Sequence, residues 1–150
     1  MVESTYKLDP RLAADTVTIG EWPLCDVLLM NDRQFPWLIL VPKLAGIREL
    51  AELDEQQSQQ LLAESRLCQQ VMMALFSPYK MNVAALGNVV EQLHIHHVAR
   101  QRDDVAWPAP VWGRQPAQPY GADELNSQCE ELRITLEKQG DLITFTRKSA

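Results

Sequence analysis

Residues 87–100 read GNVVEQLHIHHVAR, and this stretch contains all three histidines of the 150-residue chain. Its β-branched and apolar residues predict a strand over residues 89–99. Gly87 and Asn88 come directly before this strand and predict a turn. A strand is a rigid mount for chemical groups, which suits precise catalysis. The histidines are therefore the first candidates for a functional site.

The geometry of a strand divides these histidines into two groups. Successive side chains point to opposite faces, so Gln92, His94 and His96 are expected to share one face. His97 is expected on the other face, and we interpret it as a structural residue. Neighbours on one face lie roughly 7 Å apart, because a strand rises about 3.3 Å per residue. Two imidazoles at that separation can reach two atoms of one small substrate.

Three interpretations of the His94 and His96 pair fit the residues alone. The pair could be packed or hydrogen-bonded in the sheet without a chemical role. It could bind a metal, but zinc takes three or four protein ligands, and no spacing of Asp, Glu or Cys supplies the others. It could act in nucleophilic catalysis, in which one imidazole attacks phosphorus and the other donates a proton to the leaving group. The backbone N–H groups of the turn and the Asn88 amide could then hold the phosphate oxygens.

The composition limits the class of protein. With 46% hydrophobic and 23% charged residues, the chain is typical of a globular protein. The net charge of −6 disfavours binding to a nucleic-acid duplex. No apolar run reaches the ~18 residues of a membrane span, and the N-terminus lacks the pattern of a signal peptide. Three widely spaced cysteines suit reduced thiols. We therefore expect a cytoplasmic protein that binds no membrane.

The whole chain predicts an α+β fold with an antiparallel sheet of about five strands, one long helix and one or two shorter helices. Asp54 and Gln57 form a capping-box pattern that predicts the start of the long helix. The expected elements are an N-terminal segment over 1–23 with a helical stretch near 10–14, a hairpin over 25–31 and 36–41, a helix from 54 to 77, strands over 79–86 and 89–99, an irregular arm over 100–120, a helix over 124–138 and a strand over 141–146.

In this order, the features resemble the histidine-triad (HIT) family of nucleotide hydrolases and transferases. The family signature alternates three histidines with apolar residues on one strand, and residues 92–100 fit this register with Gln92 in the first histidine place. The hairpin that ends in Pro42 and Lys43 also resembles the family. The resemblance covers about residues 24–105. We expect one HIT-like domain over residues 1–150, in which 106–150 form a C-terminal arm and helix.

The resemblance implies a role for individual residues. His94 matches the nucleophile, and His96 matches the histidine that positions the phosphate and the leaving group. Asn88, in the turn with Gly87, matches the residue that holds phosphate oxygens, and Asn31 matches a polar residue near the ribose. The implied ligand is a purine nucleotide or nucleotide conjugate, and the chemistry requires no metal or other cofactor. The implied assembly is a homodimer formed through the long helix and a strand, with one continuous sheet.

The implied function is release of a nucleoside monophosphate from a phosphoanhydride, phosphoramidate or ester through a phosphohistidine on His94. Gln92 departs from the family, whose first histidine supports the nucleophile, because an amide can orient an imidazole but cannot carry its proton. The alternative is therefore a nucleotide-binding or regulatory module with little catalytic activity. Trp107 and Trp112 could stack on a base, although packing of the arm is the more common use, and Arg100 is expected in a solvated turn.

Overall fold

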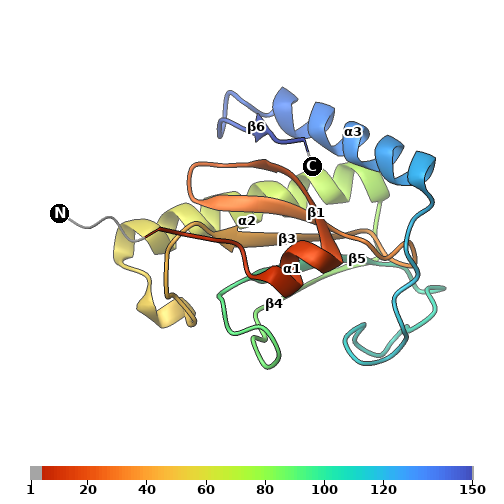
Figure 1. The fold of residues 1–150 in the computed structure, drawn as a ribbon. Helices are drawn as coiled ribbons and strands as arrows, with labels where there is room; N and C mark the ends of the chain where they lie inside the picture. The colour runs from red at the N-terminus through yellow and green to blue at the C-terminus, as the bar shows by residue number, and fades with distance from the viewer. Residues whose placement is uncertain (1–4, 150) are drawn as a thin grey trace.

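The computed structural model describes residues 5–149, which form an α+β fold around a six-stranded antiparallel sheet (Figure 1). The strands lie in the order β4-β5-β3-β2-β1-β6. Along the chain the elements are α1 (Pro10–Asp15), β1 (Thr16–Glu21), β2 (Cys25–Met30), β3 (Trp37–Pro42), the 3-10 helix η1 (Leu50–Glu52), α2 (Glu55–Phe76), β4 (Lys80–Ala84), β5 (Ile95–Arg100), α3 (Ala122–Lys138) and β6 (Thr146–Arg147).

The predicted hairpin is confirmed as β2 and β3 at the centre of the sheet. The sheet has six strands rather than about five, because residues 16–21 form β1 alongside β2. At the C-terminus, β6 is shorter than the expected strand. It pairs only two residues with β1, and residues 141–143 form a turn and a bend that follow directly from the end of α3.

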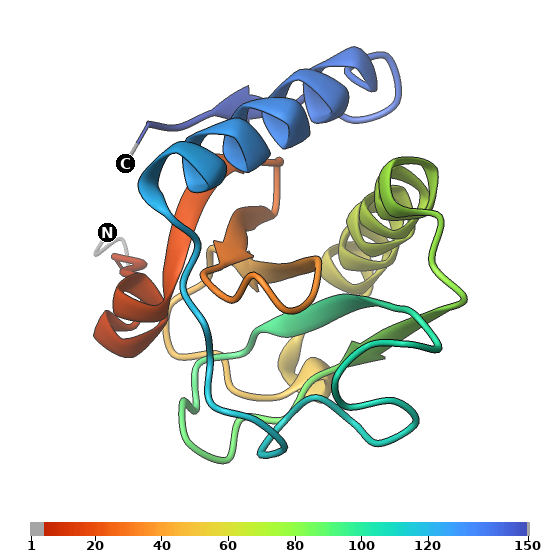
Figure 2. The same cartoon turned by 90° about the vertical axis from the view of Figure 1, so that its right-hand side faces the viewer.

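The two faces of the sheet carry separate apolar clusters. Alternate residues of β3 place Leu38 and Leu40 against α2 and α3, and Trp37, Ile39 and Val41 on the opposite face. Figure 2 shows α2 and α3 on one side of the sheet and the irregular segment after β5 on the other. One face is therefore closed by helices, and the other is covered by α1, a loop and the arm.

The long helix α2 begins as the sequence predicts. The Asp54 carboxylate accepts from the Gln57 N–H at 2.8 Å, and the Gln57 side chain accepts from the Asp54 N–H at 2.9 Å. Further along, the fully buried carboxylate of Glu64 accepts from the N–H groups of Leu24 and Cys25, both at 2.9 Å. These bonds satisfy a buried charge, and they join the helix to the start of β2.

The histidine strand is shorter than predicted. β5 begins at Ile95, and residues 85–94 form an irregular loop that includes residues 89–94, where the first half of the strand was expected. Gly87 has a φ of +76°, which favours glycine and turns the chain out of extended geometry. The Leu93 N–H then donates to the carbonyl of Ile47 at 2.9 Å. Strand alternation therefore applies only from Ile95 onward, and Gln92 lies in the loop.

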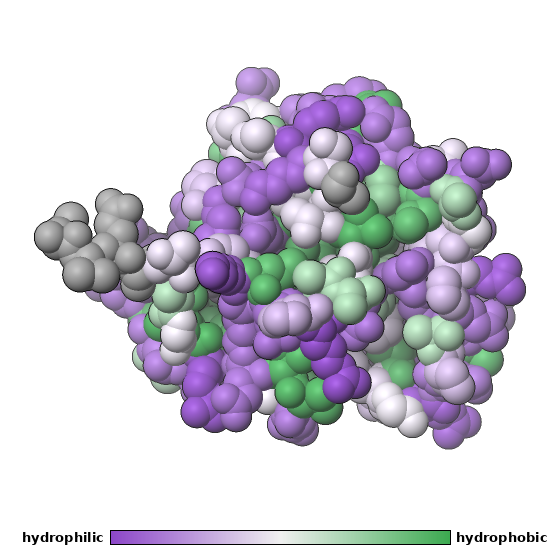
Figure 3. All heavy atoms as spheres, in the orientation of Figure 1, coloured by the Kyte–Doolittle hydropathy of each residue, from purple (hydrophilic) through white to green (hydrophobic). Residues whose placement is uncertain are grey.

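No helix within residues 5–149 is long and apolar enough to cross a membrane. On the face drawn in Figure 3, hydrophilic side chains predominate and hydrophobic ones lie in separate patches. The apolar residues of α2 that face the sheet, such as Leu67 and Val71, are buried.

Candidate active site

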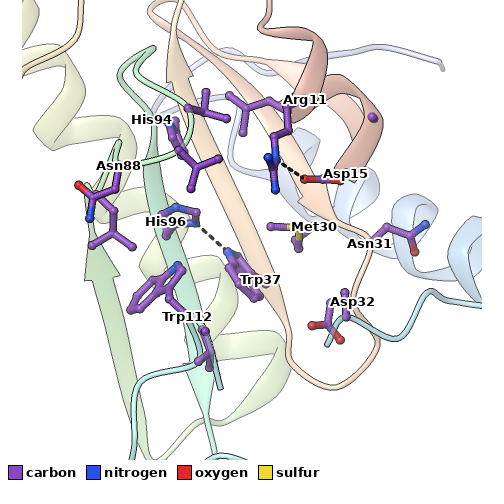
Figure 4. Close-up of a pocket in the computed structure, with 18 of the residues that line it drawn as sticks. Arg11, Asp15, Met30, Asn31, Asp32, Trp37, Asn88, His94, His96 and Trp112 are labelled. Carbon is purple, nitrogen blue, oxygen red and sulfur yellow. Dashed lines mark hydrogen bonds and ion pairs between the residues drawn. The ribbon is translucent and has the colours of Figure 1, made fainter. Parts of the chain in front are cut away.

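A cavity of about 660 Å³ lies on the sheet face that is opposite to α2. Its volume is within the range of small-ligand sites, about 300–1,000 Å³. The walls come from α1, the end of β2, the start of β3, the loop over 85–94 and the arm. Figure 4 shows His94 and His96 on one wall, with Arg11 and Asp15 of α1 facing them. The predicted histidine pair therefore lines a cavity built from distant segments.

His94 lies just before β5 and is 6% exposed. Its Nδ1 is 2.6 Å from the main-chain carbonyl oxygen of Gln92. A carbonyl can only accept a hydrogen bond, so Nδ1 carries the proton. In the neutral imidazole with its proton on Nδ1, the lone pair is on Nε2, and this tautomer can attack an electrophile through Nε2.

His96 has the opposite arrangement. The Trp37 indole N–H donates to its Nδ1 at 3.0 Å, and an indole N–H can only donate, so the proton of His96 is on Nε2. Burial, followed by the neighbouring imidazoles of His94 and His97, lowers the pKa of His96 to about 3. The centroids of the His94 and His96 rings are 4.9 Å apart. The cavity wall thus presents the Nε2 lone pair of neutral His94 beside the neutral Nε2–H donor of His96.

The structure places His97 on the other face, as strand alternation predicts. Its Nδ1 lies 3.0 Å from the carbonyl oxygen of Ile95, and its Nε2 lies 2.7 Å from the hydroxyl of Ser65 on α2. Nδ1–H therefore donates to the carbonyl, and the Ser65 hydroxyl donates to Nε2. Burial lowers the pKa of His97 to about 4. This neutral histidine links β5 to the long helix.

The prediction that Gln92 shares a strand face with His94 and His96 is wrong. Its side chain does not line the cavity with His94 and His96. Instead Nε2 donates to the carbonyl of Lys7 at 2.8 Å, and Oε1 accepts from the N–H of Asp9 at 2.9 Å. The reason is that the loop before β5 removes Gln92 from the strand face. Gln92 contacts His94 through its main chain, while its amide fixes the N-terminal segment.

The other predicted residues, Asn31, Gly87 and Asn88, all line the cavity. The Oδ1 atom of Asn31 accepts from the Tyr120 N–H at 3.0 Å, so this side chain also anchors the end of the arm. The structure thus brings together five of the six predicted site residues and leaves out only the side chain of Gln92.

Two residues at the cavity, Arg11 and Trp37, were not predicted as site residues. A third, Trp112, was predicted only to stack on a base or to pack the arm. Arg11 is the cation among the described lining residues, and it lies 3.9 Å from the Asp15 carboxylate. Trp37 bonds His96, and Trp112 of the arm packs on the same imidazole, with ring centroids 5.3 Å apart. The Asp9–Pro10 start signal could locate the helix that carries Arg11, but no local pattern places that helix at the same cavity as His94 and His96.

The two tryptophans of the arm have different surroundings. Trp112 lines the cavity, whereas Trp107 packs edge-to-face on Tyr79 and under the Arg100 guanidinium. The expectation for Arg100 is wrong, because its side chain is 1% exposed. It makes two bonds to Asp104, at 2.8 and 3.0 Å, and further bonds to Asn82 and the Ala109 carbonyl. Arg100 holds the arm against the sheet and is not free to bind phosphate.

Within residues 5–149, no group of three or more His, Cys, Asp or Glu side chains is arranged to hold a metal ion. The three cysteines are buried free thiols. Burial is the largest cause that raises the pKa of Cys25, Cys68 and Cys129, which disfavours the reactive thiolate. The three thiols are therefore not candidates for a reactive nucleophile.

Comparison with known proteins agrees with this geometry. The model of the HIT domain matches residues 11–103. The chain belongs to the HIT family. This match begins earlier than the resemblance seen in the sequence, because it includes α1 and β1. A search of curated proteins gave no significant match.

Solved structures of bacterial HIT proteins share the fold at substantial identity. A histidine triad protein from Marinobacter aquaeolei VT8 is 53% identical, with a TM-score of 0.87 over 90% of this chain and 98% of that one. Histidine triad proteins from Sinorhizobium meliloti 1021 and Bradyrhizobium japonicum are 41% and 39% identical, each with a TM-score of 0.85 over 88% of this chain and 98% of the other.

Proposed function

We propose that this HIT protein is a hydrolase or nucleotidyl transferase. It releases a nucleoside monophosphate from a phosphoanhydride, phosphoramidate or ester through a phosphohistidine on His94. The observation that carries the proposal is the bond between His94 Nδ1 and the Gln92 carbonyl. That bond directs the lone pair to Nε2, in a cavity that also holds the His96 donor. The family supports nucleotide binding, and the tautomer of His94 supports catalysis.

The proposed reaction has two displacements. The Nε2 atom of His94 attacks the phosphorus attached to the nucleoside, and the bond from phosphorus to the leaving group breaks with its electron pair. Water or another acceptor then attacks the same phosphorus, the bond from phosphorus to Nε2 breaks, and the acceptor's proton passes to solvent. The Gln92 carbonyl stabilises the positive charge that His94 carries in the intermediate.

The cavity offers contacts for each part of a purine nucleotide. In this proposal the phosphate oxygens accept from the N–H groups of loop residues 87–90 and from the guanidinium of Arg11, all of which line the cavity. Met30, Val111 and Trp112 provide apolar and aromatic surface for the base. The amide nitrogen of Asn31 is a donor for the ribose, since its oxygen is already used by Tyr120.

The proposal is tested by trapping the intermediate. Protein mixed with an AMP-releasing substrate labelled at the α-phosphorus should give an acid-labile nucleotidyl-protein after a rapid quench. His94→Ala should abolish this species and lower kcat by about 10³-fold or more, with AMP binding retained as the control for folding. Turnover that persists in His94→Ala rejects the mechanism. AMP binding without turnover of any substrate would instead favour a nucleotide-binding or regulatory module.

The same proposal includes a homodimer, for which α2 and β4 provide a surface. β4 is an edge strand of the sheet. Beside it lies an apolar groove of about 350 Å³ between α2, η1 and β4. Leu50, Leu62 and Val83 are 49%, 62% and 43% exposed on this groove. A second copy seated there would pair with the open edge of β4 and bury these side chains.

A further inference from the structure

We propose that Trp37 fixes His96 as a neutral hydrogen-bond donor, so that the site supplies no proton to the leaving group. The site would then select substrates whose leaving group departs as a stable anion. Among the three classes above, these are phosphoanhydrides, including mixed anhydrides of a nucleotide with a carboxylic acid. This inference rests on the proposed function and narrows its substrate class.

The first step of the argument is the environment of Trp37. Its ring is 7% exposed and is held edge-to-face by Phe35 and Trp112, at centroid distances of 6.4 and 6.2 Å. The indole N–H that these contacts fix points at Nδ1 of His96, at 3.0 Å. Protonation of Nδ1 would set two donors against each other in a buried place. Trp37 therefore opposes the imidazolium form of His96.

The second step concerns what a neutral His96 can do. Its Nε2–H can donate a hydrogen bond to a phosphoryl or bridging oxygen and stabilise charge there. Transfer of that proton would leave an imidazolate, because it is the only N–H proton on the neutral ring, and a buried imidazolate is costly to form. His96 is thus an electrostatic donor in this site, in place of the general acid that the sequence alone allowed.

The third step is a search of the cavity for another acid. Besides the two histidines, the titratable lining residues among 5–149 are Arg11, Asp15 and Asp32. Arginine does not give up its proton in proteins. Asp15 is the ion-pair partner of Arg11. Asp32 Oδ1 accepts from the main chain and side chain of Gln34, both at 3.0 Å, and from the Gln118 N–H at 3.4 Å. Both carboxylates act as acceptors.

Neither His94 nor Gln92 can act as the missing acid that would protonate the leaving group. The Nδ1 proton of His94 is held by the Gln92 carbonyl, and Nε2 is consumed in the bond to phosphorus. The Gln92 amide is hydrogen-bonded to the main chain of residues 7 and 9. An amide also cannot act as an acid near neutral pH, because it does not release its N–H proton. The leaving group must therefore carry away its electron pair as an anion.

Leaving groups differ sharply in this respect. A carboxylate, with a pKa of about 4, leaves unprotonated, and a phosphate ester, whose second pKa is about 6, leaves as its anion. An alkyl amine, with a pKa of about 10, must be protonated before or while its bond to phosphorus breaks. Simple alcohols have the same need. The site should therefore cleave anhydrides quickly and unactivated esters and alkyl phosphoramidates slowly.

The inference is tested with a leaving-group series. AMP esters of phenols, from dinitrophenol to unsubstituted phenol, are compared with an AMP alkyl phosphoramidate and an acetyl–AMP anhydride. We expect kcat/KM to fall steeply with leaving-group pKa, by about 100-fold or more, which is the usual contribution of a general acid. A flat series, or a phosphoramidate cleaved as fast as the anhydride, overturns the inference while the proposed function stands. No turnover of any compound overturns both.

Trp37→Phe tests the positioning role, with Trp112→Phe as the matched control. Both variants remove an indole beside His96, but only Trp37 bonds Nδ1, and the Trp112 N–H has no partner within the described residues. In Trp37→Phe, His96 becomes able to take up a proton, so the leaving-group dependence should flatten as pH falls. Trp112→Phe should keep the steep dependence. The same result in both variants argues against the role of Trp37.

Nitrogen NMR of histidine gives a readout that does not depend on activity. In the unmodified protein we expect His96 as the Nε2–H tautomer throughout the neutral range, and Trp37→Phe should shift it toward a mixture that titrates. Trp112→Phe should leave the tautomer unchanged. If Trp37→Phe does not fold, the NMR spectrum of the unmodified protein still tests the inference. A proton on Nδ1 of His96, or titration of His96 near neutral pH, overturns it.

Discussion

The main-chain carbonyl of Gln92 lies 2.6 Å from Nδ1 of His94, while the Gln92 side chain reaches residues 7 and 9 on the far side of the loop. One residue thus serves two neighbours through different atoms. The orientation of His94 does not depend on which side chain stands at position 92. The position of the N-terminal segment, in contrast, does depend on the side chain at position 92.

Gln92→Ala should therefore weaken substrate binding more than it slows chemistry. The variant loses two hydrogen bonds to the segment that leads into α1, which carries Arg11 to the cavity. We expect a loss of about 1–2 kcal/mol in the free energy of unfolding, faster hydrogen exchange over residues 7–13, a higher KM and little change in kcat. Gln92→Glu keeps the acceptor for the Asp9 N–H, so its stability and KM should lie between those of Gln92→Ala and the unmodified protein. A large fall in kcat at unchanged KM would show that the side chain acts on His94.

The salt bridge between Arg100 and Asp104 should be a major source of stability for the arm. Both side chains are buried, with exposures of 1% and 8%. Arg100→Met leaves the Asp104 carboxylate without its partner, which typically costs about 3–5 kcal/mol. Chemical denaturation followed by tryptophan fluorescence measures this loss. Arg102→Met is the matched control, since Arg102 lies on the surface over Tyr79, and it should cost less than about 1 kcal/mol. Equal losses in the two variants would contradict the assignment.

Stability should fall as the pH drops below about 6.5, because of the buried histidines. Burial lowers the pKa of His97 from the ordinary 6.5 to about 4, so between these values the unfolded chain binds more protons than the folded one. The stabilisation is complete above pH 6.5 and is lost as pH falls toward 4, by about 3 kcal/mol at 1.36 kcal/mol per pKa unit. Denaturant titrations across this range measure the slope. His97→Gln should be less stable at pH 7 and show a smaller slope, and an unchanged slope would exclude His97 as the source.

The proposed homodimer depends on the groove between α2 and β4. Leu62→Glu places a charge at the centre of this apolar surface, so sedimentation velocity should show a monomer where the unmodified chain is a dimer. Leu142→Glu is the control, because Leu142 is 69% exposed but follows α3, away from the groove. Dissociation by both variants, or by neither, would place the interface elsewhere.

Local sequence patterns were sufficient for the elements that the chain forms with its near neighbours. The capping box at Asp54 and Gln57 located α2, and the hairpin followed from two apolar runs around a polar turn. Alternation also separated His96 from His97 correctly, because both lie within β5. Each of these features depends on contacts over a few residues, which a sequence pattern records.

The errors concern contacts across the chain. Gln92 bonds residues more than eighty positions away, and its departure from the strand depends on the loop over residues 85–94, which contains the left-handed Gly87. The bond from Trp37 to His96 joins β3 to β5 across 59 positions. Arg100 is buried because the irregular arm folds back over it. The placement of irregular segments is set by tertiary packing, so one sequence could not predict it.

His96 and His97 are 5% and 0% exposed, and burial lowers the pKa of His96 to about 3 and that of His97 to about 4. Histidine is the side chain that ordinarily titrates between about pH 5 and 8. In the folded molecule these two imidazoles should therefore stay unprotonated in this range. On unfolding, both imidazoles reach solvent together and begin to exchange protons with the medium. An unbuffered solution near pH 6 would thus become more alkaline as the protein melts, and a pH electrode alone could follow the transition.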